Sequence, residues 1–348
     1  VISASHNPYE DNGIKFFDAT GSKLSDETEA RIEALLDGPA LTRESVKLGR
    51  ATRVDKSRVV YQEFCASTIP KGTDLSGLKI VIDCAHGAAY KVAPRVLTDL
   101  GAEIIPIGCS PNGKNINLRC GSTAPELLQL TVSGVQADVG IALDGDGDRL
   151  VMVDHLGRLV DGDRLLYVIA LDRQEQGELR GPVVGTVMSN LGLEHALRGR
   201  GIDFLRAAVG DRYVLELLRQ HDGVLGGETS GHLLCLDRTT TGDGLVSALQ
   251  VLAVMKRTGR SLAELAAGMP RFPQVMINVT IRERINPRES GPIQEHVRRV
   301  EESLGSTGRV VLRASGTEPL IRVMVEGQDE AVVMRHAEEL AETVRRAV

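Results

Sequence analysis

The stretch that decides the fold is LKIVIDCAHGAAYKVAPRVLTDLGAEII, residues 78–105. Its first part, 78–83, is a β-branched apolar run that ends in a glycine-containing turn, and a helical pattern follows through Leu100. A second strand-like run covers 101–105. This order predicts a strand, a helix and a second strand, which is the repeating unit of parallel sheets.

The same plan recurs further along the chain. The run GPVVGTV at 181–187 predicts a strand, a turn at Asn190 precedes a helical pattern through Arg200, and 201–204 predicts the next strand. Two such units predict two related α/β domains. Aromatic residues make up 3% of the chain, so the cores must be built from aliphatic side chains, as in sheets covered by helices.

The end of the chain has a different pattern. The segments 274–281, 309–313 and 322–326 alternate apolar and polar residues, as half-exposed strands do, and 329–348 is an amphipathic helical pattern. We expect a smaller α+β domain there.

Segments with glycine or proline near Pro70, Asp161 and Pro270 divide the chain. Before Pro70 the only clear element is a helix from Glu27 to Leu36, capped by Ser25 or Asp26, which is too little for a complete α/β domain. We therefore expect a remnant of a first domain that has lost its front part. The expected domains are 1–69, 70–160, 161–270 and 271–348.

Composition excludes several classes of protein. The net charge is −6 with scattered cations, so a nucleic-acid partner is not expected. No apolar segment is long enough to span a membrane. The five cysteines form no C-x-x-C pair, which predicts free thiols in a reducing compartment. We expect a cytoplasmic protein.

The strongest chemical signal is IALDGDGDR, residues 141–149. An apolar strand delivers Asp144, Asp146 and Asp148, and the intervening glycines let the three carboxylates converge on a hard divalent cation, Mg²⁺ above all. An EF-hand calcium loop is excluded, because Arg149 and His155 stand at the positions where that loop requires glycine and glutamate. An acidic turn without metal remains the alternative.

Three other loops carry polar groups. Ser5 precedes His-Asn-Pro, a context that suits either a phosphoryl-accepting nucleophile or a simple turn. The loop GGETSGH, 226–232, offers groups that bind sugar hydroxyls, although a lone histidine is more often a structural hydrogen-bonding group than a catalyst. The loop RASGTEP, 313–319, has the composition of a phosphate cradle or of an ordinary turn between strands.

In this order, ISASHNP (2–8), DGDGDR (144–149), GETSGH (227–232) and RASGTEP (313–319) resemble the α-D-phosphohexomutase superfamily over essentially the whole chain. The sequences of these motifs are most similar to those of the bacterial phosphoglucosamine mutase branch, and VGDRYV at 209–214 supports this. The resemblance implies related α/β domains with mixed sheets and a smaller C-terminal domain around a central cleft. It also implies residues ahead of the serine loop, including a Gly-Thr-x-Gly-x-Arg segment, that are not in this chain.

The resemblance further implies an isomerase that converts glucosamine 6-phosphate into glucosamine 1-phosphate for cell-wall amino-sugar synthesis. Phosphorylated Ser5 would donate its phosphoryl group, Mg²⁺ would assist, and a sugar 1,6-bisphosphate would be the intermediate and activator. A homodimer is the candidate assembly. The implied catalytic residues are Ser5, His6, Lys15 and Arg149. The implied metal ligands are Ser5, Asp144, Asp146 and Asp148, and the implied substrate contacts are Glu228, Ser230, His232, Arg313, Ser315, Gly316, Thr317 and Arg322.

Three alternatives remain open at this point. The first is a phosphomannomutase/phosphoglucomutase of the same superfamily, with another sugar preference. The second is a fragment that binds sugar phosphate without turnover, because the missing front part would leave the serine loop mobile. The third is a phosphatase that uses the same aspartates and releases inorganic phosphate.

Overall fold

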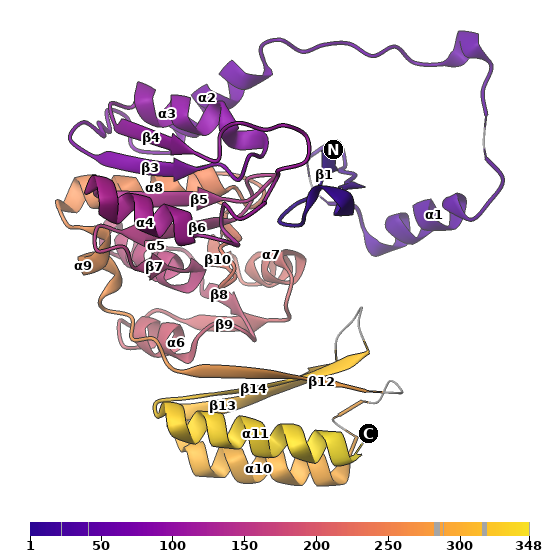
Figure 1. Ribbon diagram of the computed structural model, residues 1–348, viewed down its shortest axis with the longest axis vertical. Coiled ribbons are helices and arrows are strands. Elements are labelled where there is room, and N and C mark those ends of the chain that lie inside the picture. The colour runs from indigo at the N-terminus through magenta and orange to yellow at the C-terminus, as the bar shows by residue number, and fades with distance from the viewer. Residues whose placement is uncertain (22, 41, 282–285, 288, 315–318, 348) are drawn as a thin grey trace. The chain divides into compact units, whose positions relative to one another are not determined.

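The computed structural model describes residues 1–21, 23–40, 42–281, 286–287, 289–314 and 319–347 (Figure 1). The chain forms two compact units. The first unit contains 1–162 and 230–265, and the second contains 163–229 and 266–348. None of the described helices combines the length and the apolar character that a membrane crossing requires. All five cysteines are free, as expected.

A five-stranded mixed sheet is the centre of the first unit. Its strands, in spatial order, are β4 (Glu103–Ile107), β3 (Lys79–Asp83), β5 (Val139–Leu143), β6 (Leu150–Asp154) and β7 (Leu159–Val160). Strands β4, β3 and β5 are parallel, whereas β6 and β7 run antiparallel to their neighbours. The predicted strand–helix–strand unit is confirmed, with α3 (Val92–Asp99) as its helix.

Helices cover both faces of this sheet. On one face, α4 (Glu126–Val135) packs Leu128 and Val132 against side chains of β3, β5 and β6. On the other, Gly244 of α8 (Gly244–Thr258) meets Leu143 of β5. Burial on both faces explains why β5 is apolar along its whole length. The sheet therefore fixes the end of β5, where the aspartate loop begins.

The amino-terminal part of the first unit is built from short elements. Strands β1 (Ile2–Ser3) and β2 (Gly13–Ile14) form an antiparallel pair. The predicted helix is present as α1 (Asp26–Leu36), with Ser25 accepting a hydrogen bond from the Thr28 N–H. The remaining elements of this unit are η1 (Tyr9–Asp11), η2 (Ser45–Lys47), α2 (Ser57–Ser67), η3 (Ala88–Tyr90), β11 (Leu233–Cys235) and most of α9 (Leu262–Ala266).

The second unit contains the second predicted strand–helix–strand unit. Strands β10 (Leu225–Gly227), β8 (Val183–Thr186) and β9 (Phe204–Ala207) are parallel in that order. Helix α6 (Leu191–Arg198) connects β8 to β9, and α7 (Asp211–Gln220) connects β9 to β10. Helix α5 (Gly162–Gln176) precedes them.

The two strands expected at 101–105 and 201–204 begin later than predicted, at Glu103 and Phe204. The reason is the same in both units. Gly101 and Gly201 adopt positive φ values of 97° and 72° and close the preceding helices through backbone hydrogen bonds. They lie in the turns that follow α3 and α6 and are not strand residues, so the prediction was wrong at these positions.

The chain ends in an antiparallel sheet covered by two helices. The strand order is β12 (Gln274–Thr280), β14 (Leu320–Gly327) and β13 (Gly308–Ala314). Helices α10 (Gly291–Leu304) and α11 (Glu330–Ala347) lie together along the sheet, as Figure 1 shows, and bury an aliphatic core against it. The 3-10 turn η4 (Gly305–Thr307) links α10 to β13. The α+β ending and its terminal helix are confirmed.

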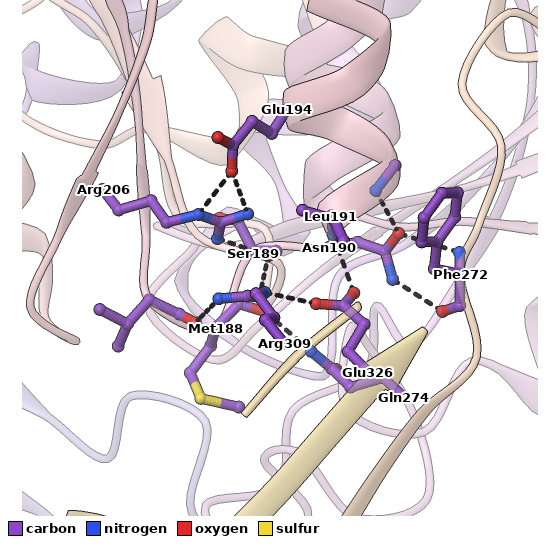
Figure 2. Close-up of polar contacts among 12 residues, drawn as sticks. Met188, Ser189, Asn190, Leu191, Glu194, Arg206, Phe272, Gln274, Arg309 and Glu326 are labelled. Atoms are coloured by element: carbon purple, nitrogen blue, oxygen red, sulfur yellow. Dashed lines mark hydrogen bonds and ion pairs between the residues drawn. The ribbon is translucent and has the colours of Figure 1, made fainter. Parts of the chain in front are cut away.

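A polar network joins this sheet to the start of α6 within the second unit (Figure 2). Glu326 on β14 is fully buried, accepts a hydrogen bond from the Leu191 N–H at 2.8 Å and pairs with Arg309 Nε at 2.7 Å. Arg309 also donates to two carbonyl oxygens of the turn before α6. Asn190, the N-cap of α6, exchanges two hydrogen bonds with the backbone of Phe272.

Candidate active site

The serine loop follows β1 and is held by hydrogen bonds to its own backbone. Ser5 has a φ of 52°, a left-handed conformation that is uncommon for a residue other than glycine. Its N–H donates to Ser3 Oγ at 2.8 Å, and the Asn7 N–H donates to the Ala4 carbonyl at 2.9 Å. Ser5 Oγ lies 3.2 Å from His6 Nδ1. The loop thus fixes the direction of the hydroxyl at a sharp turn.

The aspartate loop leaves the buried strand β5 directly. Asp144 Oδ1 accepts hydrogen bonds from the N–H groups of Gly147 and Arg149, both at 3.1 Å, which curls the loop. Gly147 has a φ of 79°, so a residue with a side chain would be strained there. The strand before the loop also excludes the EF-hand, in which a helix precedes the aspartates.

The three carboxylates of Asp144, Asp146 and Asp148 fit a divalent cation. One oxygen from each lies within 4.8 Å of the others. Among the described residues, no hydrogen-bond donor reaches Asp144 Oδ2, Asp146 Oδ1 or Asp148 Oδ1, although these oxygens are buried. Burial, followed by the charges of Asp148 and Asp146, raises the pKa of Asp144. Such repulsion among hard oxygen ligands is what a bound Mg²⁺ relieves.

Cationic side chains surround these carboxylates. Lys15 Nζ lies 2.6 Å from Asp146 Oδ2 and 3.9 Å from Asp148 Oδ2. Burial opposes the charged form of Lys15, but the hydrogen bond and charge of Asp146 outweigh burial and raise the pKa of Lys15. Burial and then the charge of Arg149 lower the pKa of His6, which favours its neutral imidazole. The structure therefore brings Ser5, His6, Lys15, Arg149 and the three aspartates into one neighbourhood of the first unit.

His232 belongs to the same neighbourhood. It forms a β-bridge with Arg149, and its Nδ1 lies 3.7 Å from Asp148 Oδ1. Burial alone would raise the pKa of Asp148, but the neighbouring His232 side chain, followed by the charges of Lys15 and Arg149, lowers it. A side chain at Gly242 would clash with the His232 ring, so this glycine lets the imidazole sit there. Ser230, two residues earlier in the chain, is exposed.

The other expected substrate contacts lie in the second unit. Glu228 accepts a hydrogen bond from the Gly210 N–H at 3.0 Å. Arg313 on β13 stands directly opposite Arg322 on β14 in the strand register. Burial and then the charge of Arg322 lower the pKa of Arg313. Two cations held side by side suit a dianionic phosphate. Ser315, Gly316 and Thr317 lie outside the described residues.

Four family models match the chain in order. All four describe phosphoglucomutase/phosphomannomutase: alpha/beta/alpha domain I matches 1–42, domain II 60–157, domain III 161–272 and the C-terminal domain 276–343. The chain belongs to the phosphoglucomutase/phosphomannomutase family. The α/β multidomain fold class and the resemblance noted from sequence are thereby confirmed.

Relatives in this family are identical to the chain at more than half of the aligned residues. A protein named phosphoglucosamine mutase from Methylobacillus flagellatus is 58% identical over 346 residues, which cover 99% of this chain and 76% of that protein. A protein of the same name from Methylococcus capsulatus is 57% identical over 347 residues, 100% of this chain and 78% of its own length. The chain thus aligns almost completely with about three-quarters of each relative.

Solved structures share the family fold at lower identity. A phosphoglucomutase/phosphomannomutase family protein of Burkholderia thailandensis has a TM-score of 0.79 at 23% identity, covering 100% of this chain and 76% of that chain. N-acetylphosphoglucosamine mutase of Aspergillus fumigatus, solved with GlcNAc-6P and magnesium, has a TM-score of 0.80 at 20% identity, covering 99% and 88%. At these identities the likeness concerns the fold alone.

Ser3 is a site residue that the sequence did not single out. Its hydroxyl donates to Asp146 Oδ2 at 2.6 Å while accepting the Ser5 N–H, so it links the serine loop to the aspartate loop across 143 residues of sequence. The sequence held no signal for Ser3, because its partner Asp146 lies 143 residues away and the chain leaves the strand directly after Ser3.

Proposed function

We propose that the chain catalyses the phosphoglucosamine mutase reaction, the interconversion of glucosamine 6-phosphate and glucosamine 1-phosphate. The observation that carries this proposal is the direct contact between the serine loop and the aspartate loop. Ser3 and Lys15 both donate hydrogen bonds to Asp146. Relatives that are 54–58% identical over nearly the whole chain bear the name of this enzyme. The reaction makes the chain an isomerase that acts by phosphoryl transfer.

Ser5 is the proposed phosphoryl carrier. In the first half-reaction the bond between phosphorus and Ser5 Oγ breaks, and a sugar hydroxyl forms the new bond to phosphorus. The proton of the sugar hydroxyl passes to a basic group, and Ser5 Oγ takes up a proton from an acidic group. The product is a sugar 1,6-bisphosphate, which turns round and returns its other phosphoryl group to Ser5. Lys15 and His6 are the proposed proton carriers, and Arg149 contributes fixed positive charge beside the same oxygens.

Asp144, Asp146 and Asp148 are the proposed ligands of a Mg²⁺ ion, with an oxygen on Ser5 as a fourth ligand. When bound, the ion supplies positive charge that stabilises phosphoryl transfer. One buried oxygen of each carboxylate accepts no hydrogen bond from the described residues and is therefore available to the ion. The Arg149 N–H donates to Asp144 Oδ1 and holds this carboxylate in place. The structure of the Aspergillus fumigatus relative with GlcNAc-6P and magnesium is consistent with this choice of ion.

The remaining residues are proposed to bind the sugar phosphate. Glu228 and Ser230 offer groups for sugar hydroxyls, and His232 lies beside the aspartate loop, near the reacting end. Arg313, Ser315, Gly316, Thr317 and Arg322 are proposed to hold the phosphate that does not react. Binding energy at that distant phosphate orients the reacting hydroxyl, so its loss should lower kcat as well as raise KM.

The setting of the reaction is also a proposal. A glucosamine phosphate product suits amino-sugar synthesis for the cell wall, which places the enzyme in the cytoplasm with a small-molecule substrate. A homodimer is the proposed assembly, and gel filtration with light scattering would test it. The domain limits 1–69, 70–160, 161–270 and 271–348 likewise stay a prediction.

The decisive experiment combines an assay with a mass measurement. The chain is incubated with Mg²⁺, a hexose 1,6-bisphosphate and glucosamine 6-phosphate, and glucosamine 1-phosphate is quantified. We expect turnover and an intact mass increased by one phosphate, both lost in Ser5→Ala and both kept in Ser133→Ala, which changes an exposed serine on α4.

Each alternative has its own outcome in the same experiment. Faster conversion of glucose or mannose phosphates would assign another sugar preference. Release of inorganic phosphate without bisphosphate formation would assign a phosphatase. Neither phosphate on Ser5 nor turnover would overturn the proposed activity and leave a binding role.

A further inference from the structure

Asn117, in the segment between β4 and α4, holds the serine loop from the side. Its Nδ2 donates two hydrogen bonds, to the carbonyl oxygens of Ser5 and Asn7, both at 2.8 Å. These carbonyls flank His6, and they lie more than a hundred positions away in sequence. A single carboxamide therefore fastens both sides of the turn that presents the Ser5 hydroxyl.

The orientation of this amide is fixed by its partners. Both contacts are carbonyl oxygens, which only accept hydrogen bonds, so the nitrogen must face them. A flipped amide would place Asn117 Oδ1 against two acceptors and lose both bonds.

Asn117 is itself anchored to the central sheet. Its φ of 58° is left-handed, a conformation that asparagine tolerates better than most residues. Its N–H donates to the Ala85 carbonyl at 2.9 Å, and the Ala85 N–H donates to the buried carboxylate of Asp83 at the end of β3. The clamp on the serine loop is thus connected by hydrogen bonds to the central sheet of the first unit.

The aspartate loop touches the same clamp. A Cβ built on Gly145 would lie 2.5 Å from the Ser5 carbonyl oxygen and 2.7 Å from Asn117 Nδ2, so glycine is the only residue that fits without a shift. The Gly145 carbonyl in turn accepts a hydrogen bond from the Ala88 N–H at 2.8 Å. The serine loop, the Asn117 carboxamide and the aspartate loop therefore pack directly against one another. Asn117 sets the distance between the two loops.

We propose that Asn117 is a positioning residue for phosphoryl transfer, which holds the Ser5 hydroxyl in place against the aspartate loop. The proposal rests on the proposed mutase function. Without the clamp, the turn at Ser5 can relax from its left-handed conformation and the hydroxyl is misplaced. Misplacement by about 1 Å is enough to slow a reaction about 100-fold. The sugar phosphate contacts proposed in the second unit are untouched, so KM should change little.

The test uses two substitutions of the full chain. Asn117→Gly removes the carboxamide and keeps a residue that tolerates a positive φ. Asn117→Asp keeps the shape but presents acceptors to both carbonyls. We expect kcat to fall about 100-fold in both, with KM for glucosamine 6-phosphate nearly unchanged. We also expect faster amide hydrogen exchange in residues 3–7, measured by mass spectrometry without substrate.

Asn115→Ala is the matched control, because the hydrogen-bond partners of the Asn115 side chain within the described part of the chain, Asn112 and Ser110, belong to its own segment. It should leave exchange in residues 3–7 and kcat unchanged. Wild-type exchange in a folded Asn117→Gly variant, or an unchanged kcat, would overturn the positioning role. If the wild-type chain itself shows no phosphate on Ser5 and no turnover, the mutase function fails, while the exchange rates still decide whether the clamp exists.

Discussion

The ion pair of Arg309 and Glu326 shows how much one residue contributes to the stability of the second unit. Glu326 is fully buried, and its partner is only 17% exposed. Removing one member of such a pair leaves a buried charge uncompensated, so Arg309→Met should lower the free energy of unfolding by about 3 kcal/mol at neutral pH. Urea unfolding followed by circular dichroism measures the loss.

The loss should depend on pH, because burial raises the pKa of Glu326 even in the presence of Arg309. A carboxyl with a raised pKa binds its proton more readily in the folded chain, so it favours folding below its ordinary pKa and loses that effect as pH rises through the raised value. The deficit of Arg309→Met should therefore shrink from about pH 8 to about pH 5. Arg335→Met, at an exposed position on α11, is the control. An equal deficit at both pH values would assign the loss to packing.

At this scale the sequence predicted residues whose chemistry is local. Asp144, Asp146 and Asp148 stand at alternate positions after an apolar strand, and the structure brings them together. Ser3 and Asn117 were not predicted, because their roles depend on hydrogen bonds to residues more than a hundred positions away. No spacing rule reports such a contact.

Helix α8 shows how one element supports the site. Asp243 caps it by accepting a hydrogen bond from the Val246 N–H at 2.9 Å, and the same side chain accepts one from the Tyr61 hydroxyl at 2.7 Å. The Gly244 N–H donates to the Gly147 carbonyl at 2.8 Å, so the start of α8 contacts the aspartate loop directly. The cap therefore bears on both stability and the position of this loop.

Replacing Asp243 with Ala should destabilise the first unit by about 2 kcal/mol, since it removes the cap and leaves the Tyr61 hydroxyl without its acceptor. Urea unfolding monitored by hydrogen exchange of α8 peptides measures this. Ser25→Ala removes the cap of α1, a helix whose described residues are not buried, and should leave that transition in place. A similar shift in both variants would contradict the special role of the α8 cap.

Element types were easier to predict than element limits. The runs ending at Asp83 and Leu143 are strands as their β-branched, apolar character indicates. Gly101 and Gly201 were assigned to strands, although both close a helix. A glycine between a helix and a strand has the same sequence signal in either role, and only the backbone hydrogen bonds distinguish the two.

For the whole molecule, the division into two units makes metal binding testable apart from catalysis. All four proposed ligands of Mg²⁺, Ser5 and the aspartates 144, 146 and 148, belong to the first unit. A ligand that binds only the folded form stabilises it by about 2.7 kcal/mol when its concentration is about 100 times the Kd. Mg²⁺ should therefore raise the urea midpoint of the first unit and leave that of the second unit nearly unchanged.

Pulse-labelling hydrogen exchange at increasing urea assigns a midpoint to each segment. Peptides from β3 and β5 report the first unit, and peptides from β12 and β14 report the second. Asp146→Asn is the control, because it keeps the side-chain size and removes one charged ligand, so the Mg²⁺ shift should disappear. A shift that persists in this variant would place the ion elsewhere. An equal shift in both units would mean that they unfold together, and the aspartate loop would then govern the stability of the entire chain.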